Sequence, residues 1–219
     1  MAIPSEDDST KVILAESRYH RASLKADART VHLNPRTEAA DAALRRAETA
    51  EDEADGARID AFALFVRSDV DLDEECRAAE IAHLAAVRKN REDAAYRAVW
   101  PNGLSDLIAS RGAEQARAVR AAVTELGTHA PAIHAAHQAR LLELATLTET
   151  RETAWRNAET AAAQAFANER IARVGLIEQL RKNEGALREI FPNERNIVRS
   201  FYRSDRRGKK KAKADPVTG

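Results

Sequence analysis

The chain has 219 residues, and its 35 lysines and arginines balance 35 aspartates and glutamates, so the formal net charge is zero. Hydrophobic residues make up 44%, but 46 residues are alanines and only 5% of the chain is aromatic. Large apolar side chains supply most of the free energy of burial, so the core must be narrow. Abundant Ala, Glu, Arg and Leu with 8 Gly and 6 Pro favour long helices. The composition therefore predicts an all-α fold without a polyelectrolyte character.

Cysteine usage and hydropathy point to the compartment. The single cysteine, Cys76, excludes an intramolecular disulfide framework and suits a reducing cytoplasm. Its acidic neighbours in sequence, Glu74 and Glu75, would raise the pKa of the thiol, so we expect a packing residue rather than a nucleophile. The sequence contains no signal peptide and no uncharged apolar run of about 18 residues. We expect a soluble, cytoplasmic protein.

The first region, residues 1–36, begins with an acidic leader over residues 1–8 that we expect to be frayed. Ser9 or Thr10 can cap a first helix over about residues 10–31. The dipeptide Asn34-Pro35 is predicted to end that element, because the residue before a proline avoids the α region.

The second region, residues 37–102, contains no proline before Pro101, and its only glycine before Trp100 is Gly56. Its apolar residues recur at helical spacing, which predicts one long helical segment. Pro101 with the following Asn-Gly is a strong stop. The polar sequence at residues 68–71 is the one place where the segment offers an interruption.

The rest of the chain divides into three regions. Residues 103–130 form a connector, with short helices predicted at about 104–110 and 113–126. Residues 131–202 form a second long helical segment that begins at Pro131, a residue suited to a first helical turn, and ends in a short amphipathic turn. Residues 203–219 are a basic tail that its composition predicts to be disordered.

An internal repeat relates the two long segments. Residues 88–102 and 181–193 share an Arg-Lys-Asn start, an alanine, an arginine and an aromatic-Pro-Asn stop. The two stops consist of Trp100, Pro101 and Asn102, and of Phe191, Pro192 and Asn193. At an offset of 93 residues Phe62 also pairs with Trp155. These matches predict a duplication of about residues 37–102 and 130–193.

Geometry selects a topology for the duplicated segments. A helix of about 60 residues spans on the order of 90 Å, and a partly helical connector of about 28 residues is too short to cover that distance. The second copy must then run antiparallel to the first. We predict an elongated antiparallel helical bundle, of coiled-coil type, with the two aromatic-Pro-Asn stops at opposite ends. The alternative is a compact four-helix bundle, in which each copy bends near its middle, as residues 68–71 allow.

Two residue clusters resemble metal sites. Asp69, Asp71 and Asp73, with Glu80 at the twelfth position, imitate a calcium-binding loop, but Glu74 occupies the sixth position, which requires glycine. We interpret this cluster as the acid-rich N-terminus of a helix.

A histidine cluster is the second candidate. His129, His134 and His137 lie close together in sequence, yet no carboxylate or cysteine lies beside them to complete a ligand set. We expect solvated or partly buried histidines. The sequence also lacks a phosphate-binding glycine loop and a nucleophile elbow. We therefore predict no catalytic residue, no metal site and no cofactor.

Charge is distributed unevenly along the chain. Residues 48–75 contain eleven acids and two arginines, whereas residues 203–213 contain seven basic residues and one acid. The basic residues are Arg203, Arg206, Arg207, Lys209, Lys210, Lys211 and Lys213. They can hold nucleic-acid phosphates through counterion release, or meet the acidic stretch of another molecule. The apolar residues that precede them, Ile197, Val198, Phe201 and Tyr202, offer a short contact for an anionic membrane.

These features favour a non-enzymatic structural or scaffolding protein that acts through helix–helix contacts and associates with itself. One alternative is an accessory nucleic-acid-binding protein that uses the basic tail. A second, less favoured alternative is a helical protein that lies on membranes. The sequence identifies no specific partner beyond a further copy of the chain.

Overall fold

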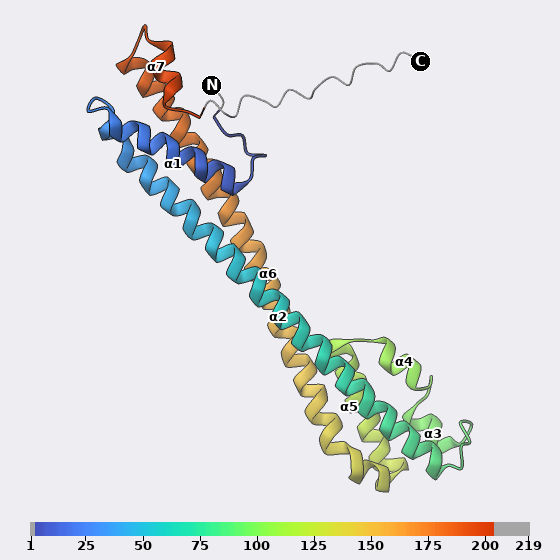
Figure 1. Cartoon of the computed structure of the whole chain (residues 1–219). Helices are drawn as coiled ribbons and strands as arrows, with labels where there is room; N and C mark the ends of the chain where they lie inside the picture. The colour runs from blue at the N-terminus through green and yellow to red at the C-terminus, as the bar shows by residue number, and fades with distance from the viewer. Residues whose placement is uncertain (1–2, 204–219) are drawn as a thin grey trace, which may run out of the picture. The chain divides into compact units, whose positions relative to one another are not determined.

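The computed structural model describes residues 3–203, and all of the secondary structure in that range is helical (Figure 1). The prediction of an all-α fold is confirmed. The elements are α1 (Thr10–Ala26), the 3-10 turn η1 (Val31–Leu33), α2 (Asn34–Ala86), α3 (Ala94–Val99), α4 (Leu104–Ala109), α5 (Gly112–His129), α6 (Pro131–Ile190) and α7 (Arg195–Ser200). The connector helices α4 and α5 lie close to their predicted positions.

The chain divides into two units, each with its own core. Unit 1 consists of Met1–Glu53 and Ala163–Gly219, and unit 2 consists of Ala54–Ala162. The boundary falls within α2 and within α6, so each unit contains part of both long helices, packed together.

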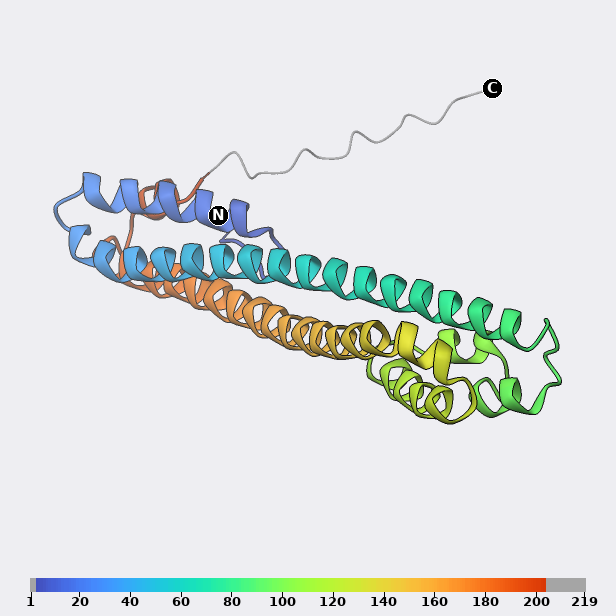
Figure 2. The same ribbon diagram turned by 90° about the horizontal axis from the view of Figure 1, so that it is seen from below.

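Unit 2 is built around an apolar core to which α2, α3, α5 and α6 all contribute. Leu72 and Cys76 of α2 face Leu141 and Leu144 of α6, and Leu126 of α5 completes the interior. All five side chains are at most 2% exposed. The short helix α3 packs against α5, and Figure 2 shows α3, α4 and α5 gathered at one end of this unit.

Within unit 2 the two long helices run antiparallel. The Thr148 hydroxyl donates to the carbonyl of Ser68, and His137, earlier on α6, lies 2.7 Å from the Glu75 carboxylate, later on α2. Helix α2 continues without a break through residues 68–71. The Ser68 hydroxyl donates to the carbonyl of Phe65 within the helix, so its polar group is satisfied without a bend. The interruption that the four-helix alternative requires in the first copy is absent from α2.

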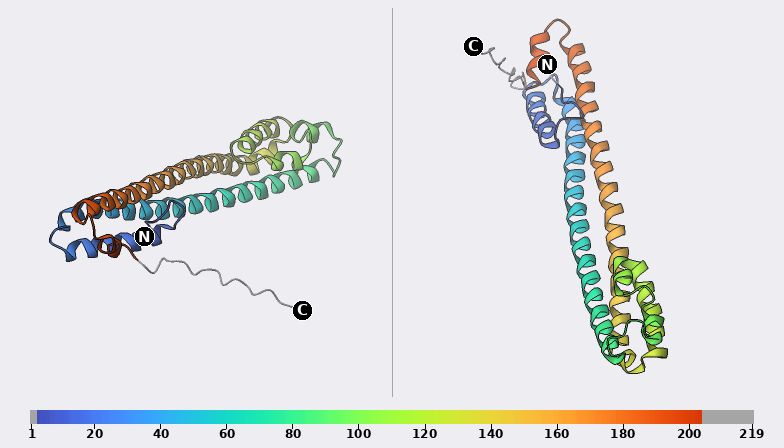
Figure 3. Two further views of the ribbon diagram at one scale, coloured as in Figure 1. Left: turned by 90° about the horizontal axis from the view of Figure 1, so that it is seen from above. Right: turned by 90° about the vertical axis from the view of Figure 1, so that its right-hand side faces the viewer.

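Unit 1 combines α1, the start of α2, the end of α6 and α7, as both views of Figure 3 show. One apolar cluster joins α1 to the long helices through Ile13, Leu44 and Leu176. A second cluster joins Leu24 of α1 to the end of α6 and to α7. Ile3, in the leader predicted to be frayed, packs against both clusters.

The segment before α2 differs from the prediction. Helix α1 ends at Ala26, where the Asp27 carboxylate accepts a hydrogen bond from the Arg29 N–H and favours a turn. Asn34 and Pro35 begin α2 rather than ending a helix, and Asn34 has φ −63° and ψ −41°. A proline within the first helical turn costs no intrahelical hydrogen bond, because the first N–H groups of a helix have no partner within it.

The first predicted long segment is interrupted between Ala86 and Ala94. Arg88 and Lys89 adopt positive φ angles of 54° and 64°, and the Lys89 N–H donates to the carbonyl of Leu84, which closes the helix end. The equivalent Arg-Lys-Asn sequence at residues 181–183 stays helical within α6. The first copy contains a capping residue that favours the break, because the Asp93 carboxylate accepts the N–H of Ala95 at the start of α3.

Candidate functional site

An apolar stripe on α2 is exposed in unit 2. It comprises the exposed Ile59, Phe62 and Val70 and the half-buried Val66, which recur at intervals of three and four residues and therefore share one side of the helix. Ile59 is 53% exposed, Phe62 45% and Val70 41%. Trp155 of α6 lies beside the stripe, with its ring centroid 5.3 Å from that of Phe62. We call these five residues the aromatic face.

Most of the aromatic face, from Ile59 to Val66, lies before the level at which α5 begins. The Ala113 N–H at the start of α5 donates to the Glu152 carboxylate, and the Gly112 N–H donates to Asp69. Helix α5 therefore starts level with Asp69 and Glu152. Between residue 54 and Asp69, the level at which α5 begins, only α6 packs beside α2 within this unit.

The acidic cluster that imitates a calcium loop holds the start of α5. Asp69 accepts the Gly112 N–H, and Asp73 accepts a 2.6 Å hydrogen bond from the Gln115 side chain. Burial raises the pKa of Asp69. Burial alone would also raise the pKa of Glu152, but hydrogen bonds from Arg156 and the Ala113 N–H lower it overall. The prediction that these acids begin a helix is wrong, because they lie inside α2. Asp69 and Asp73 instead contact the start of α5.

The histidine cluster does not converge on one point. The Nδ1 atom of His137 lies 2.7 Å from the Glu75 carboxylate, whereas His129 lies 3.5 Å from Glu125. His134 packs against the backbone of Gly127. Across residues 3–203, no group of three or more His, Cys, Asp or Glu side chains is arranged to hold a metal ion.

Cys76 lies in the core of unit 2 and is 1% exposed. Burial, followed by the charges of Asp73 and Glu75, raises the pKa of its thiol to about 12. A neutral, enclosed thiol is a poor nucleophile, since the thiolate is the reactive form.

Among the described helices, none is long and apolar enough to cross a membrane.

A second candidate is a cavity of about 640 Å³ in unit 1, between the last turns of α6 and α7. Phe191, Val198 and Ile3 form apolar walls, and the first two are buried. Three arginines and one glutamate supply the polar walls: Arg188, Arg195, Arg199 and Glu184. We call this cavity the arginine pocket.

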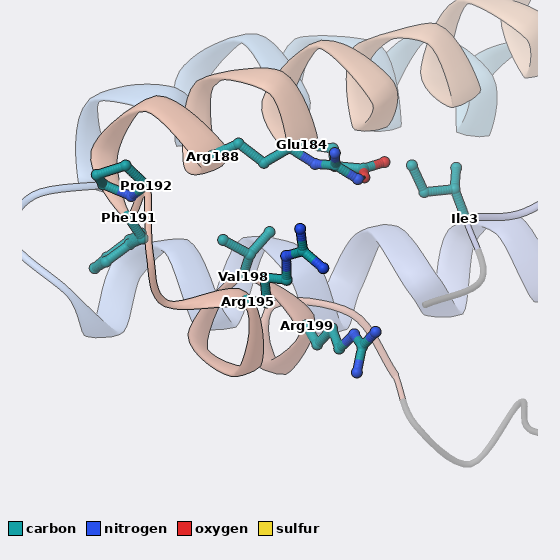
Figure 4. Close-up of a pocket in the computed structure, with 8 residues that line it drawn as sticks. All are labelled: Ile3, Glu184, Arg188, Phe191, Pro192, Arg195, Val198 and Arg199. Carbon is teal, nitrogen blue, oxygen red and sulfur yellow. The ribbon is translucent and has the colours of Figure 1, made fainter.

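The chain reversal after α6 builds the arginine pocket. Glu184 and Arg188 lie one turn apart on α6 and form a 2.5 Å ion pair. The chain then turns at Pro192, and α7 places Arg195 and Arg199 one turn apart. Figure 4 shows Arg195 pointing from α7 into the space below Glu184 and Arg188, with Arg199 further along the same helix.

The predicted contact residues of the tail fall mostly outside the described range. Arg203 is described, and its backbone N–H donates to the buried Glu16 carboxylate of α1. The residues outside that range are Arg206, Arg207, Lys209, Lys210, Lys211 and Lys213. Val198, Phe201 and Tyr202, which the membrane alternative invokes, are buried in unit 1. Their side chains contribute to its second apolar cluster rather than to an exposed surface.

The aromatic-Pro-Asn stops lie in different units. Trp100 follows the end of α3 in unit 2 and is 2% exposed, with its indole N–H donated to His83. Phe191 follows the end of α6 in unit 1, where the Arg29 guanidinium lies 4.3 Å from its ring centroid. Pro101 and Asn102 are exposed after Trp100, as Pro192 and Asn193 are after Phe191.

The fold thus defines an all-helical protein with two helical units, an exposed aromatic face and an arginine-lined cavity. The chain matches no protein-family model, no curated protein and no solved structure. Sequence reasoning did not predict either candidate site. The i, i+3, i+7 spacing of Ile59, Phe62 and Val66 was the available signal for the first, but the same spacing marks a buried helix face.

Proposed function

We propose that the protein is a non-enzymatic structural or scaffolding protein that acts through helix–helix contacts. Its partner at the aromatic face is a second copy of the same chain. The observation that carries this proposal is the exposure of Ile59 and Phe62 on a stretch of α2 that precedes the start of α5, with Val70 exposed at the level of that start.

The shape of the aromatic face suits another helix. Its α2 residues follow the spacing of the apolar anchors that amphipathic helices use to dock on a partner, and Trp155 of α6 adds an aromatic ring beside Phe62. Aromatic residues are enriched at the centres of protein interfaces, where charged side chains are depleted. Monomeric soluble proteins also rarely expose large contiguous apolar patches.

A second copy fits this face better than an unrelated partner. The formal net charge of the chain is zero, so two copies approach without long-range repulsion. Two-fold contacts pair the same patch on both chains, which requires an apolar patch that can meet itself. Two antiparallel pairs of helices packed at their aromatic faces form a four-helix arrangement, in which each copy supplies the missing layer for the other.

The predicted duplication gains support from the centre of this face. Phe62 and Trp155 are equivalent residues at the offset of 93, and their rings contact each other. When two equivalent helices pair antiparallel about a local two-fold axis, the residues at the axis meet their own equivalents. We infer that the two long segments derive from one helix that paired with itself.

Self-association is tested by sedimentation of the full chain over a range of concentrations. We expect a dimer. The double variant Ile59→Ser with Phe62→Ser should raise the dissociation constant of the dimer by about 100-fold, because burial of the two apolar side chains contributes about 3 kcal/mol. The matched control is Leu64→Ser with Ile171→Ser, since Leu64 is 54% exposed and Ile171 is 70% exposed, and neither belongs to the aromatic face.

The control double variant should dimerise like the unchanged chain. A wild-type chain that stays monomeric at all concentrations would contradict the proposal. So would an equal loss of dimer in both double variants, because that result assigns association to general hydrophobicity. Circular dichroism of each variant confirms that the helices are intact before sedimentation is interpreted.

A second candidate function is accessory nucleic-acid binding through the basic tail. The observation in its favour is that Arg195 and Arg199 are exposed immediately before Arg203, which lengthens the run of basic residues. Deleting residues 204–219 should abolish retention of DNA or RNA at low salt, since such binding depends on the number of neutralised phosphates. Unchanged retention in a filter-binding assay would reject this function.

A further inference from the structure

The arginine pocket carries an excess of positive charge. Three guanidinium groups line it against the single carboxylate of Glu184, so its walls have a formal charge of about +2 at neutral pH. Glu184 is already engaged, because it forms a 2.5 Å ion pair with Arg188. Within residues 3–203, neither Arg195 nor Arg199 forms an ion pair with a carboxylate.

Two of the three arginine side chains point toward one space. Arg188 extends from α6 along one side of the cavity, and Arg195 extends from α7 into it from the other side (Figure 4). Like charges that face each other across a cavity favour an anion between them. Guanidinium groups are the preferred ligands for such an anion, because their planar donors bind two oxygens at once.

The charge and volume of the pocket indicate the class of ligand. A phosphomonoester carries about −1.5 to −2 charges at neutral pH, which balances the walls better than a single carboxylate does. The cavity of about 640 Å³ lies in the size range of sites for organic ligands. Phe191 and Val198 supply an apolar wall beside the arginines.

We propose that the arginine pocket binds a phosphomonoester, with the phosphate held by Arg195 and Arg188 and with Arg199 adding positive charge at the edge of the pocket. The organic part of the ligand lies against Phe191 and Val198. This site is independent of the aromatic face, because all of its residues belong to unit 1.

The test is isothermal titration of the full chain with phenyl phosphate, which combines a dianionic phosphate with an apolar ring. We expect saturable binding at one site, and at least about tenfold weaker binding to the double variant Arg195→Gln with Arg199→Gln, because charge-assisted hydrogen bonds are the strong ones. The matched control is Arg18→Gln with Arg46→Gln, which removes two exposed arginines of unit 1 outside the pocket.

Comparison ligands and pH sharpen the result. Inorganic phosphate should bind more weakly than phenyl phosphate, since it lacks the ring that contacts Phe191. Binding of phenyl phosphate should weaken below about pH 6, where the phosphate takes up a proton. Equal loss of affinity in both double variants, or no saturable binding to the unchanged chain, overturns the proposal.

A vesicle-binding experiment distinguishes a lipid phosphomonoester from a soluble one. If the natural ligand is a lipid, vesicles containing phosphatidic acid should sediment the unchanged chain, and the Arg195→Gln with Arg199→Gln variant should stay in solution. If the ligand is soluble, phenyl phosphate binds and vesicles do not sediment the chain. Binding of an oligonucleotide alone, without either of these, rejects the pocket as a phosphomonoester site and favours nucleic acid.

Discussion

Unit 2 encloses one continuous apolar cluster, whereas the interior of unit 1 is divided between two smaller apolar clusters and a buried hydrogen-bonded group. That polar group contains His20 of α1, Thr37 of α2 and Asn183 of α6, all at most 2% exposed. Along α1, His20 lies between Leu14 of one cluster and Leu24 of the other. Unit 2 also buries hydrogen-bonded pairs, such as Trp100 with His83 and Thr148 with Ser68, but they leave its apolar cluster undivided. In unit 1 the polar group lies between two apolar clusters, so stability depends more strongly on its hydrogen bonds.

The hydrogen bonds around His20 define its protonation state. The Asn183 amide nitrogen lies 2.7 Å from the Thr37 hydroxyl and 2.9 Å from Nε2 of His20, while Nδ1 of His20 lies 3.0 Å from the carbonyl of Phe201. These contacts are satisfied when Nδ1 carries the proton and Nε2 accepts from Asn183. The ring also stacks on Tyr202, with centroids 4.7 Å apart. A neutral histidine fits this site.

The largest expected effect is a cavity in unit 2. Leu144 is 2% exposed within its core, so Leu144→Ala should lower the free energy of unfolding by about 2–5 kcal/mol, because lost burial and an unfilled space both destabilise. Urea denaturation followed by circular dichroism measures the change. The exposed Leu64→Ala is the control, with an expected change within about 0.5 kcal/mol. Equal effects in both variants would contradict the described core.

Acidification should act on unit 1. Burial lowers the pKa of His20 from 6.5 to about 4, although the contact with Phe201 partly opposes the shift. Between those pH values the unfolded chain takes up a proton at His20 and the folded chain does not, so stability falls as the pH falls. The expected loss by pH 4 is on the order of 3 kcal/mol. Urea denaturation between pH 7.5 and pH 4 measures it.

The control for acidification is His20→Gln, which removes the titrating ring and keeps a polar side chain. Its stability should depend less steeply on pH than that of the unchanged chain over this interval. Identical pH dependence in the two chains would show that His20 does not titrate as its burial implies.

The buried Asn183 amide should make the next largest contribution to the stability of unit 1. Asn183 donates to Thr37 and His20 and accepts from the Gln179 side chain. Asn183→Ala should destabilise the protein by about 1–3 kcal/mol, because it leaves buried polar groups without partners. Asn157→Ala, at an exposed position of the same helix, is the matched control. A thermal melt in which both variants unfold together would argue against the buried network.

The two smallest expected changes in stability come from replacing glycines, and they have opposite signs. Gly112 has φ +60°, and an added Cβ would collide with the Glu152 carboxylate, so Gly112→Ala should destabilise by about 1–2 kcal/mol. Gly56 lies within α2 with open space around it, so Gly56→Ala should stabilise by about 0.5–1 kcal/mol. Chemical denaturation of the two variants distinguishes a required glycine from a tolerated one.

Composition and periodicity were enough to predict the helices but not their ends. The stretches that became α5 and α6 contain good helix formers bounded by Gly or Pro, and such signals act locally. The break after Ala86 was missed because residues 88–90 read the same as residues 181–183. The difference arises from neighbours, since Asp93 caps a new helix in one copy and Asn183 is buried by α1 and α2 in the other.

The sequence by itself determined that this chain is helical, because helix propensity and proline or glycine stops depend on residues only a few positions apart. The tertiary structure alone decided which side of each helix is buried. Phe65 is enclosed and stacks on Trp155 of α6, with ring centroids 5.6 Å apart, while Phe62, three residues away on the same helix, stays 45% exposed. It also brought Arg188 and Arg195 to one cavity, since only the chain reversal at Pro192 places α7 against α6.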